Sequence, residues 1–421
     1  MAHIKRRSNY CKRAKKTEQT AQMLETLQVS EFSQHINNAI ARYKYLNREG
    51  LSDAESFAEL DKVLEQGQKM HQQMNPSDPN YLRFYYDYLY GLDFRGHSKV
   101  VIENFTQLNI PLGKLPAYVR HAIADSYLAE QKPKQAEFAY KTLLTEKNYP
   151  DMTVYTGLYY SYIEQEKYKE AEQLLAEVDR LIPTYKYSQA KGVDKTSHPD
   201  RDDYIALQGM HLAYANHLNQ AEKHFQKKVE QAPANESLIN NLARVERWRE
   251  KPLEAKKTIS RLNGIDPIAK DTRINEMQNA QALGDIPTWR KTTQNLVQYY
   301  PDDSGVIKSR KELEDRNRAT ISHSTTWGQS KADGRDTVSG QNGLKDREME
   351  TRLNSPWIND NYRLFAWHQD RYGEYRFGDV HDQRYGVGAE WQANRKALSA
   401  IVSQSTDGGQ AGVRLDWSQW L

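Results

Sequence analysis

The chain has 421 residues, of which 38% are hydrophobic and 27% charged, with a formal net charge of +3 at pH 7. This length allows two or three domains. Cys11 is the one cysteine of the sequence, which excludes an internal disulfide, and no run of 18 apolar residues exists, which excludes a membrane-spanning helix. Barrel strands alternate in polarity, so a membrane protein of that type stays possible.

The N-terminal segment is strongly basic. It holds Lys5, Arg6, Arg7, Lys12, Arg13, Lys15 and Lys16. No apolar stretch follows, so the segment is not a signal peptide. A basic arm for nucleic acid is one interpretation, and a disordered segment over residues 1–30 is the one we favour.

A helical repeat follows over residues 31–318. Pro233, Pro267 and Pro301 lie 34 residues apart, the period of the tetratricopeptide repeat. Each repeat also shows a small residue and, four positions later, a larger apolar one, as tight packing of two antiparallel helices requires. These pairs are Ala136/Tyr140, Ala171/Leu175, Ala221/Phe225 and Ala255/Ile259. A polar insert at about 184–201 lengthens the step from Pro183 to Pro233.

From residue 319 to 421 the pattern changes to short antiparallel strands. Charged residues at even positions of 343–354 alternate with Arg347, Met349, Thr351 and Leu353 at odd positions. Alternating runs of about ten residues are the length that a tilted strand needs to cross a bilayer. The predicted strands are 319–328, 343–354, 361–370, 383–392, 397–404 and 410–418.

Tryptophans and connection lengths favour a membrane barrel over a soluble β-sandwich, which shows the same alternation. The connections run long, short, long, short and intermediate, as in barrels with short periplasmic turns and long external loops. The long gap 329–342 would then be external, and the repeats would lie in the periplasm. An interfacial aromatic girdle is predicted from Trp327, Trp357, Trp367, Trp391, Trp417 and Trp420.

At this point the chain resembles a known family, the outer-membrane porins that export poly-β-1,6-N-acetyl-D-glucosamine, called PgaA or HmsH. The resemblance runs from the repeats to the end and is strongest in three segments. These are Gly343-Leu344-Lys345-Asp346-Arg347-Glu348, Thr351-Arg352-Leu353-Asn354-Ser355-Pro356 and Tyr362-Arg363-Leu364-Phe365-Ala366.

The resemblance implies an α + β architecture: a periplasmic tetratricopeptide α-solenoid followed by a sixteen-stranded barrel with an acidic lumen. It also implies that the helical domain receives partly deacetylated polymer near a periplasmic polysaccharide deacetylase, and that barrel strands face outer-membrane lipid. Family members carry a signal peptide and are about twice as long, whereas six strands cannot close such a barrel. We therefore expect a fragment, an incomplete barrel that does not transport polymer alone and whose open edges make 319–421 prone to aggregate.

The polymer suggests which residues bind it, because free ammonium groups favour carboxylates and apolar sugar faces favour flat aromatic rings. In tetratricopeptide folds the first helix of each repeat lines the concave groove. This register predicts a groove for polymer or partner lined by Tyr118, His121, Asp125, Tyr160, Glu164, Asp203, Tyr214, Asn240, Arg244 and Trp248. Tyrosine in this fold also serves packing, so packing is the alternative role for each tyrosine of this set.

On the strands, the predicted lumen residues are Asp346, Glu348, Glu350, Glu390 and Asp416. Arginines share their face, so cross-strand ion pairing is the alternative role for these carboxylates.

Enzyme motifs are missing from the sequence. It shows no Gly-rich phosphate loop, no nucleophile elbow, no His-Glu-x-x-His and no ligand spacing among its histidines. We therefore expect no catalytic residues, cofactor, metal or nucleic-acid partner. Two alternative functions stay open: a repeat scaffold that binds proteins without transport, and an export component for another polysaccharide such as cellulose or alginate.

Overall fold

The computed structural model describes residues 2–147, 149–188, 194–329, 345–375, 378–406 and 408–420. It divides into two compact units, residues 1–249 and 250–421. The predicted domain boundary at 318–319 follows the change from helix to strand, whereas compactness groups the last helices with the strands. The domain boundaries given from the sequence therefore remain a prediction.

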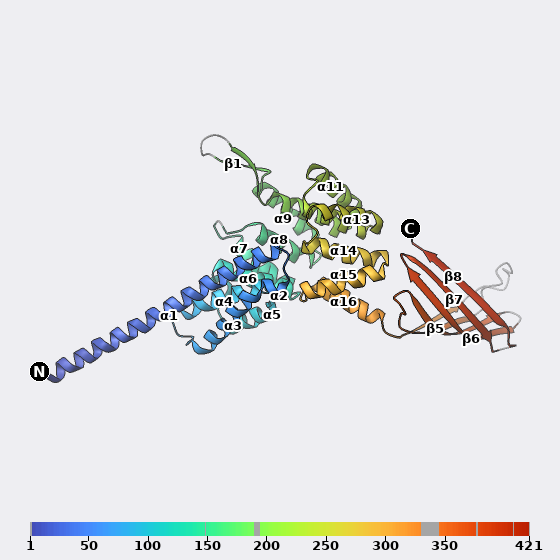
Figure 1. The fold of residues 1–421 in the computed structure, drawn as a ribbon, viewed down its shortest axis with the longest axis horizontal. Coiled ribbons are helices and arrows are strands. Elements are labelled where there is room, and N and C mark those ends of the chain that lie inside the picture. The colour runs from blue at the N-terminus through green and yellow to red at the C-terminus, as the bar shows by residue number, and fades with distance from the viewer. Residues whose placement is uncertain are drawn as a thin grey trace. The chain divides into compact units, whose positions relative to one another are not determined.

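The first unit is built from helices, which Figure 1 shows in blue to green. They are α1 (Ala2–Arg48), α2 (Asp53–Ser56), α3 (Ala58–Gln73), α4 (Tyr81–Phe94), α5 (Ser98–Leu108), α6 (Ala117–Ala129), α7 (Pro133–Leu143), α8 (Met152–Ile163), α9 (Tyr168–Leu181), α10 (Arg201–Tyr214), α11 (Leu218–Gln231) and α12 (Glu236–Trp248). The predicted insert forms a hairpin of β1 (Tyr185–Ser188) and β2 (Asp194–Ser197). Helix α1 includes the segment that the sequence led us to expect as disordered.

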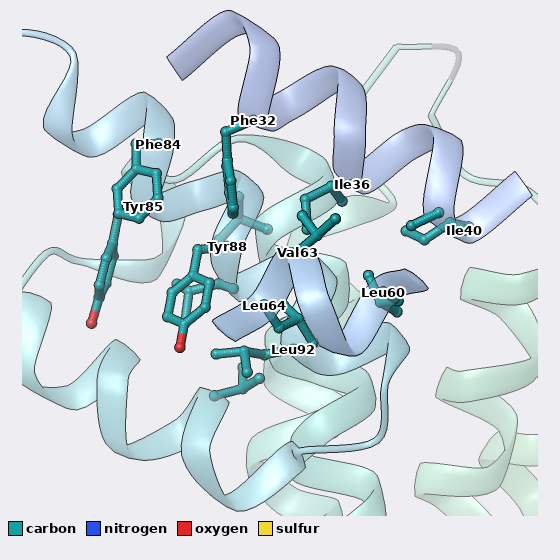
Figure 2. Packing of buried hydrophobic residues seen from close by; sticks show 14 of the residues in the cluster. Phe32, Ile36, Ile40, Leu60, Val63, Leu64, Phe84, Tyr85, Tyr88 and Leu92 are labelled. Carbon is teal, nitrogen blue, oxygen red and sulfur yellow. The ribbon is translucent and has the colours of Figure 1, made fainter. Parts of the chain in front are cut away.

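Helix α1 packs through its C-terminal half onto α3 and α4 (Figure 2). Phe32, Ile36 and Ile40 recur every four residues, so they lie on one face of α1 and are buried. They meet apolar side chains from the other two helices. Figure 2 shows this cluster with Leu60, Val63, Leu64, Phe84, Tyr85, Tyr88 and Leu92.

From α6 to α12 in the first unit, and from α13 to α16 in the second, consecutive helices pack on one another as the repeat pattern predicts. The four small residues of the predicted pairs are fully buried, and their larger partners are buried as well. Close approach also depends on glycine: a Cβ added at Gly157 would lie 2.2 Å from the ring of Tyr140, and one at Gly209 would lie 2.4 Å from Phe225. The tetratricopeptide-type solenoid predicted from the 34-residue spacing is therefore confirmed.

The second unit contains α13 (Pro252–Ser260), α14 (Lys270–Leu283), α15 (Ile286–Tyr299) and α16 (Ser304–Arg316). Its six strands form one antiparallel sheet in chain order, shown in red tones in Figure 1. They are β3 (Thr320–Gln329), β4 (Lys345–Asn354), β5 (Tyr362–Tyr375), β6 (Gly378–Ala393), β7 (Lys396–Ser405) and β8 (Ala411–Gln419).

All six predicted strands are present, but one predicted long connection is wrong. The segment 371–382 was expected as a loop, whereas β5 and β6 continue through most of it and pair up to Tyr375 and Gly378. The extension holds polar residues on both faces, such as Arg371 beside Asp382 and Tyr372 beside His381. The sequence of this extension therefore shows no alternation between polar and apolar residues.

The turn between β4 and β5 is tied to the last helices by ion pairs and stacking. Arg290 on α15 donates to the carboxylate of Asp360 through Nε and Nη2. Arg316 on α16 donates to the backbone carbonyl of Asp360 at 3.1 Å and lies 4.1 Å from the ring centre of Trp357. The guanidinium of Arg363 lies 4.6 Å from the centre of the same ring. Helices α15 and α16 therefore hold this turn from several directions.

Replacing Arg290 with alanine is expected to loosen this turn. A charge-assisted bidentate pair contributes about 1–3 kcal/mol when it is partly shielded from water. Hydrogen exchange read by mass spectrometry should show faster exchange in residues 355–361 of the variant. The control is Arg310→Ala, which removes an exposed arginine of α16 that pairs with Glu314 on the same helix. Equal exchange in both variants would contradict the role assigned to Arg290.

Candidate functional site

Three aromatic side chains form a ladder across the first helices of consecutive pairs. Tyr160 lies on α8, Tyr214 on α10 and Trp248 on α12. The ring centres of Tyr160 and Tyr214 are 6.2 Å apart, and those of Tyr214 and Trp248 are 5.8 Å apart. Trp248 is 39% exposed and the two tyrosines are half-buried. The sequence had singled out all three, and the structure brings them into one continuous row.

Charged residues flank this ladder. The carboxylate of Glu164 and the guanidinium of Arg244 both act electrostatically on Tyr214, and burial is the main cause that raises the pKa of this tyrosine. Glu164 is exposed, and Arg244 donates to the side-chain oxygen of Asn241 at 3.3 Å. The row thus combines flat rings with charges of both signs.

A second part of the predicted groove lies on α6 and is acidic. His121 lies 3.6 Å from the carboxylate of Asp125 and contacts the hydroxyl of Tyr149 at 3.3 Å. Tyr140 donates its hydroxyl proton to Asp125. Burial raises the pKa of Asp125, and the charge of Asp151 raises it further, against the lowering effects of His121 and Tyr140. Its side chain nevertheless stays 47% exposed, so solvent or a ligand reaches it.

The sequence missed the residues that α4 adds to this acidic part. Tyr118 donates to Asp87 at 2.8 Å, and its ring meets that of Tyr90 edge-on at 5.8 Å. Ser126 on α6 donates to Asp93 at 2.8 Å. Burial, with the charge of Asp125 second, raises the pKa of Asp93 well above its usual range. The aromatic crowding of 81–94 was the available signal, but the 34-residue register does not extend to this helix.

Two predicted groove residues have different surroundings. Asn240 is buried and donates to Glu236 at 3.2 Å, so its amide belongs to the packing of α12. Asp203 is exposed near the start of α10, beside Asp200 and Asp202, whose charges add to burial in raising its pKa. The structure thus groups the predicted residues into the aromatic ladder, the acidic part on α6 and these two outlying positions.

In the sheet, the strand register places all the predicted lumen carboxylates on one face. Directly paired residues share a face, and the pairs Glu350–Gln369, Glu390–Ser399 and Ser399–Asp416 connect β4 to β8. We call this the charged face. It is defined by Asp346, Glu348, Glu350, Arg352, Arg363, Arg371, Arg384, Glu390, Arg414 and Asp416.

Most carboxylates of the charged face are paired with arginine. Glu390 on β6 accepts from Arg352 on β4 and from Arg363 on β5, the latter at 2.8 Å. Glu348 pairs with Arg371 at 3.0 Å. Asp416 pairs with Arg414 at 3.0 Å. The alternative role considered from the sequence, cross-strand pairing, is therefore present at Glu390 and Glu348, whereas the partner of Asp416 lies on its own strand.

The opposite face is exposed and mainly apolar, which is unusual for a sheet in water. Near one end it also carries Asp370, which pairs with Arg347 and His381. We call it the apolar face. Its exposed members are Ile321, Leu353, Leu364, Val387, Val402, Val413 and Leu415. Tyr362, Trp391 and Trp417 lie in one row at the end of this face next to the β4–β5 and β6–β7 turns, paired through Leu398. An apolar band bordered by aromatic side chains is the pattern of a lipid-facing surface.

Two tryptophans predicted for this aromatic border lie elsewhere. Trp367 belongs to the charged face, where it is buried with Phe365 and Ile401. Trp357 lies in the turn that α16 holds. The face on which each tryptophan lies therefore depends on its position along the strand or in the turn, which the sequence pattern did not show.

Over the described ranges, no helix is both long and apolar enough to cross a membrane. Within the same part of the chain, no group of three or more histidine, cysteine, aspartate or glutamate side chains is arranged to hold a metal ion.

Comparison with known proteins gives matches for both regions. Residues 326–420 match the family model described as the PgaA membrane beta barrel domain. The poly-beta-1,6-N-acetyl-D-glucosamine export proteins of Escherichia coli K12 and O157:H7 are each 26% identical over 369 residues, which cover 84% of this chain and 44% of the relative. The chain thus spans less than half the length of these relatives.

Solved structures that match this chain include repeat proteins. A tetratricopeptide repeat protein from Parabacteroides merdae matches with a TM-score of 0.46 and 13% identity, covering 66% of this chain and 98% of its own. A repeat protein from Cytophaga hutchinsonii matches with a TM-score of 0.35 and 11% identity, covering 65% and 98%.

The matched family is a membrane barrel family and the curated relatives are named as export proteins, which agrees with the prediction that the chain is not an enzyme. The exposed apolar face and its aromatic border agree with the same assignment. Residues 326–420 therefore match the PgaA membrane β-barrel family model, and the resemblance of the chain to poly-β-1,6-N-acetyl-D-glucosamine export proteins is confirmed.

Proposed function

We propose that the helical repeats receive partly deacetylated poly-β-1,6-N-acetyl-D-glucosamine in the periplasm and guide it to an outer-membrane pore to which the six strands contribute. In this proposal the charged face lines the pore and the apolar face meets lipid. The observation that supports the binding role is the row Tyr160–Tyr214–Trp248, whose ring centres follow one another at 6.2 and 5.8 Å.

The chemistry of such a polymer fits both parts of the groove. Sugar rings present apolar faces that stack on aromatic side chains, and free amines carry positive charge that is attracted to carboxylates and ring faces. The ladder supplies the rings, while Asp125 and Glu164 supply the charge. A periplasmic polysaccharide deacetylase would be the partner that delivers the polymer.

Calorimetric titration of the full chain with two oligomers tests this function. Partly deacetylated β-1,6-glucosamine oligomers should bind, and more weakly at high salt, because exposed charges are screened. Fully acetylated oligomers of the same length should bind less tightly. Equal binding of both oligomers would remove the preference for free amines, and absence of binding would favour a docking surface for another protein.

Binding is also expected to depend on the ionisation of Asp125. Because burial raises the pKa of this carboxyl, it takes up a proton at a higher pH than an exposed aspartate does. Its contribution to binding an ammonium group is present above the raised pKa and is lost as the pH falls through it. The Asp125→Asn variant should lack this step in a pH series of titrations. An unchanged pH profile in the variant would assign the step to another group.

A further inference from the structure

The apolar face of the sheet carries a second row of aromatic and basic side chains, at the end away from the β4–β5 and β6–β7 turns. Directly paired residues share a face, and this row consists of Trp327 on β3, Arg347 on β4, Tyr372 on β5 and His381 on β6. Arg347 and Leu353 stand six positions apart on β4, so the row belongs to the apolar face. We call it the second border, and we call the aromatic row beside the two turns the first border.

The distance between the two borders matches the thickness of a membrane. Tyr362 belongs to the first border and Tyr372 to the second, so ten positions of β5 separate them. A strand rises about 3.3 Å per residue, which gives about 33 Å along the strand. At a tilt of about 40°, as in membrane barrels, this becomes about 25 Å across the membrane, which is the height of the apolar band of such barrels. On β6, Trp391 and His381 have the same separation.

Several polar side chains between the borders are paired with one another. The ring of His323 contacts the hydroxyl of Thr351 at 2.8 Å and that of Thr325 at 2.9 Å. The ring of His368 contacts the side-chain amide of Gln383 at 3.2 Å. Hydrocarbon offers no hydrogen bonds, so polar groups within it must find partners in the protein. These contacts supply such partners.

Asp370 stands two positions before Tyr372 on β5, just inside the second border. One carboxylate oxygen accepts from Nη2 of Arg347 at 2.9 Å, and the other lies 2.9 Å from Nε2 of His381. The side chain of Asp370 is 12% exposed, whereas those of Arg347 and His381 are 42% and 49% exposed. A charge inside a membrane is accommodated by partners that reach the interface. Arg347 thus stands between an internal carboxylate and the level of the lipid headgroups.

Charged side chains of both signs lie one row beyond the second border. Lys345 stands there on β4, and Glu374 on β5 is the strand partner of Asp379 on β6. Tyr372 donates its hydroxyl proton to Asp379 at 3.0 Å. A zwitterionic phospholipid headgroup carries a phosphate and an ammonium group, so a border of mixed charge complements it.

From these observations we infer that the strands bind a bilayer whose hydrocarbon layer lies between the two borders, and that Arg347 contacts lipid phosphate at the second border. The inference rests on the proposed function, which places the apolar face in lipid. It adds the depth of each row and the headgroup that the second border takes. Aromatic side chains and arginine are the residues that favour the headgroup level.

Arginine substitutions along β3 test the depth of the rows. The full chain, diluted from urea into phosphatidylcholine vesicles, would be floated on a density gradient, which separates lipid-bound chain from aggregate. Ile321 is 72% exposed and lies between the borders, so Ile321→Arg should weaken vesicle binding by about thirtyfold or more. The matched control is Ser322→Arg, an exposed neighbour on the opposite face, which should stay within about threefold. Trp327→Arg, at the second border, should lose less than about fivefold, because the cost of a charge falls near the interface.

The variant Arg347→Gln tests the headgroup contact. The wild-type chain should bind phosphatidylcholine vesicles about fivefold more tightly than vesicles of an uncharged glycolipid that has the same acyl chains and no phosphate, because hydrogen bonds to charged groups are the stronger ones. Arg347→Gln should lose this preference. The matched control is Arg414→Gln, which removes an arginine that also pairs with an aspartate but lies on the charged face. It should keep the preference.

The three replaced residues of β3 are exposed, so the packed cores stay intact in these variants. A wild-type chain that does not float, or an equal loss in Ile321→Arg and Ser322→Arg, would overturn the two borders. A preference for phospholipid that survives in Arg347→Gln would overturn the headgroup contact. The titration with sugar oligomers is read without vesicles, so the binding role proposed for the repeats is decided separately.

Discussion

Replacing Trp248 with alanine is expected to weaken the binding of partly deacetylated oligomers by about tenfold or more. The indole ends the row Tyr160–Tyr214–Trp248 and is its most exposed member. Aromatic side chains in such positions dominate binding energies, and a loss of about 1.4 kcal/mol corresponds to tenfold in affinity. Calorimetric titration of the full chain measures the change directly.

The control for this variant is Phe138→Ala. Phe138 lies on α7, the second helix of its pair, and is 65% exposed, so it is an accessible aromatic residue outside the ladder. Its removal should leave oligomer affinity within about twofold. If both variants bind oligomers as the wild-type chain does, the ladder is not the binding surface.

Phe225→Ala is expected to give the largest loss of stability. Phe225 is fully buried on α11 and contacts Gly209 so closely that a Cβ there would lie 2.4 Å from the ring. Removing such a ring leaves a cavity and costs about 3–5 kcal/mol. Because each repeat is stabilised by its neighbours, the loss should extend to α10 and α12. Urea unfolding gives the free-energy change, and hydrogen exchange shows where protection is lost.

Phe138→Ala serves again as the matched control, since it removes the same side chain from an exposed position of α7. Its free energy of unfolding should change by less than about 0.5 kcal/mol. A loss below about 1 kcal/mol in Phe225→Ala would show that the repeat interface is more adaptable than its packing suggests.

Local periodicity predicted most of the fold. The pairs Ala136/Tyr140 and Ala221/Phe225 record helix packing directly, because a small residue must stand where two helices come close. The strands were located within a few residues wherever one face is apolar. The outer parts of β5 and β6 were missed because both of their faces are polar, as Arg371 and Asp382 illustrate.

The candidate sites were predicted less completely, because they depend on contacts between distant elements. Asp93 is placed by α4 packing on α6, and its hydrogen bond to Ser126 joins residues 33 positions apart. The pairing of Glu390 with Arg352 spans three strands and needs the full register of the sheet.

Photo-crosslinking tests the central claim most directly. A partly deacetylated β-1,6-glucosamine oligomer with a photoreactive group would be irradiated with the full chain, and the modified residues located by mass spectrometry. Adducts should concentrate on α8, α10 and α12 around Tyr160, Tyr214 and Trp248, and unlabelled oligomer should compete them away. Adducts concentrated instead on the second helices, such as α7 around Phe138, would contradict a polymer-binding groove on the first helices.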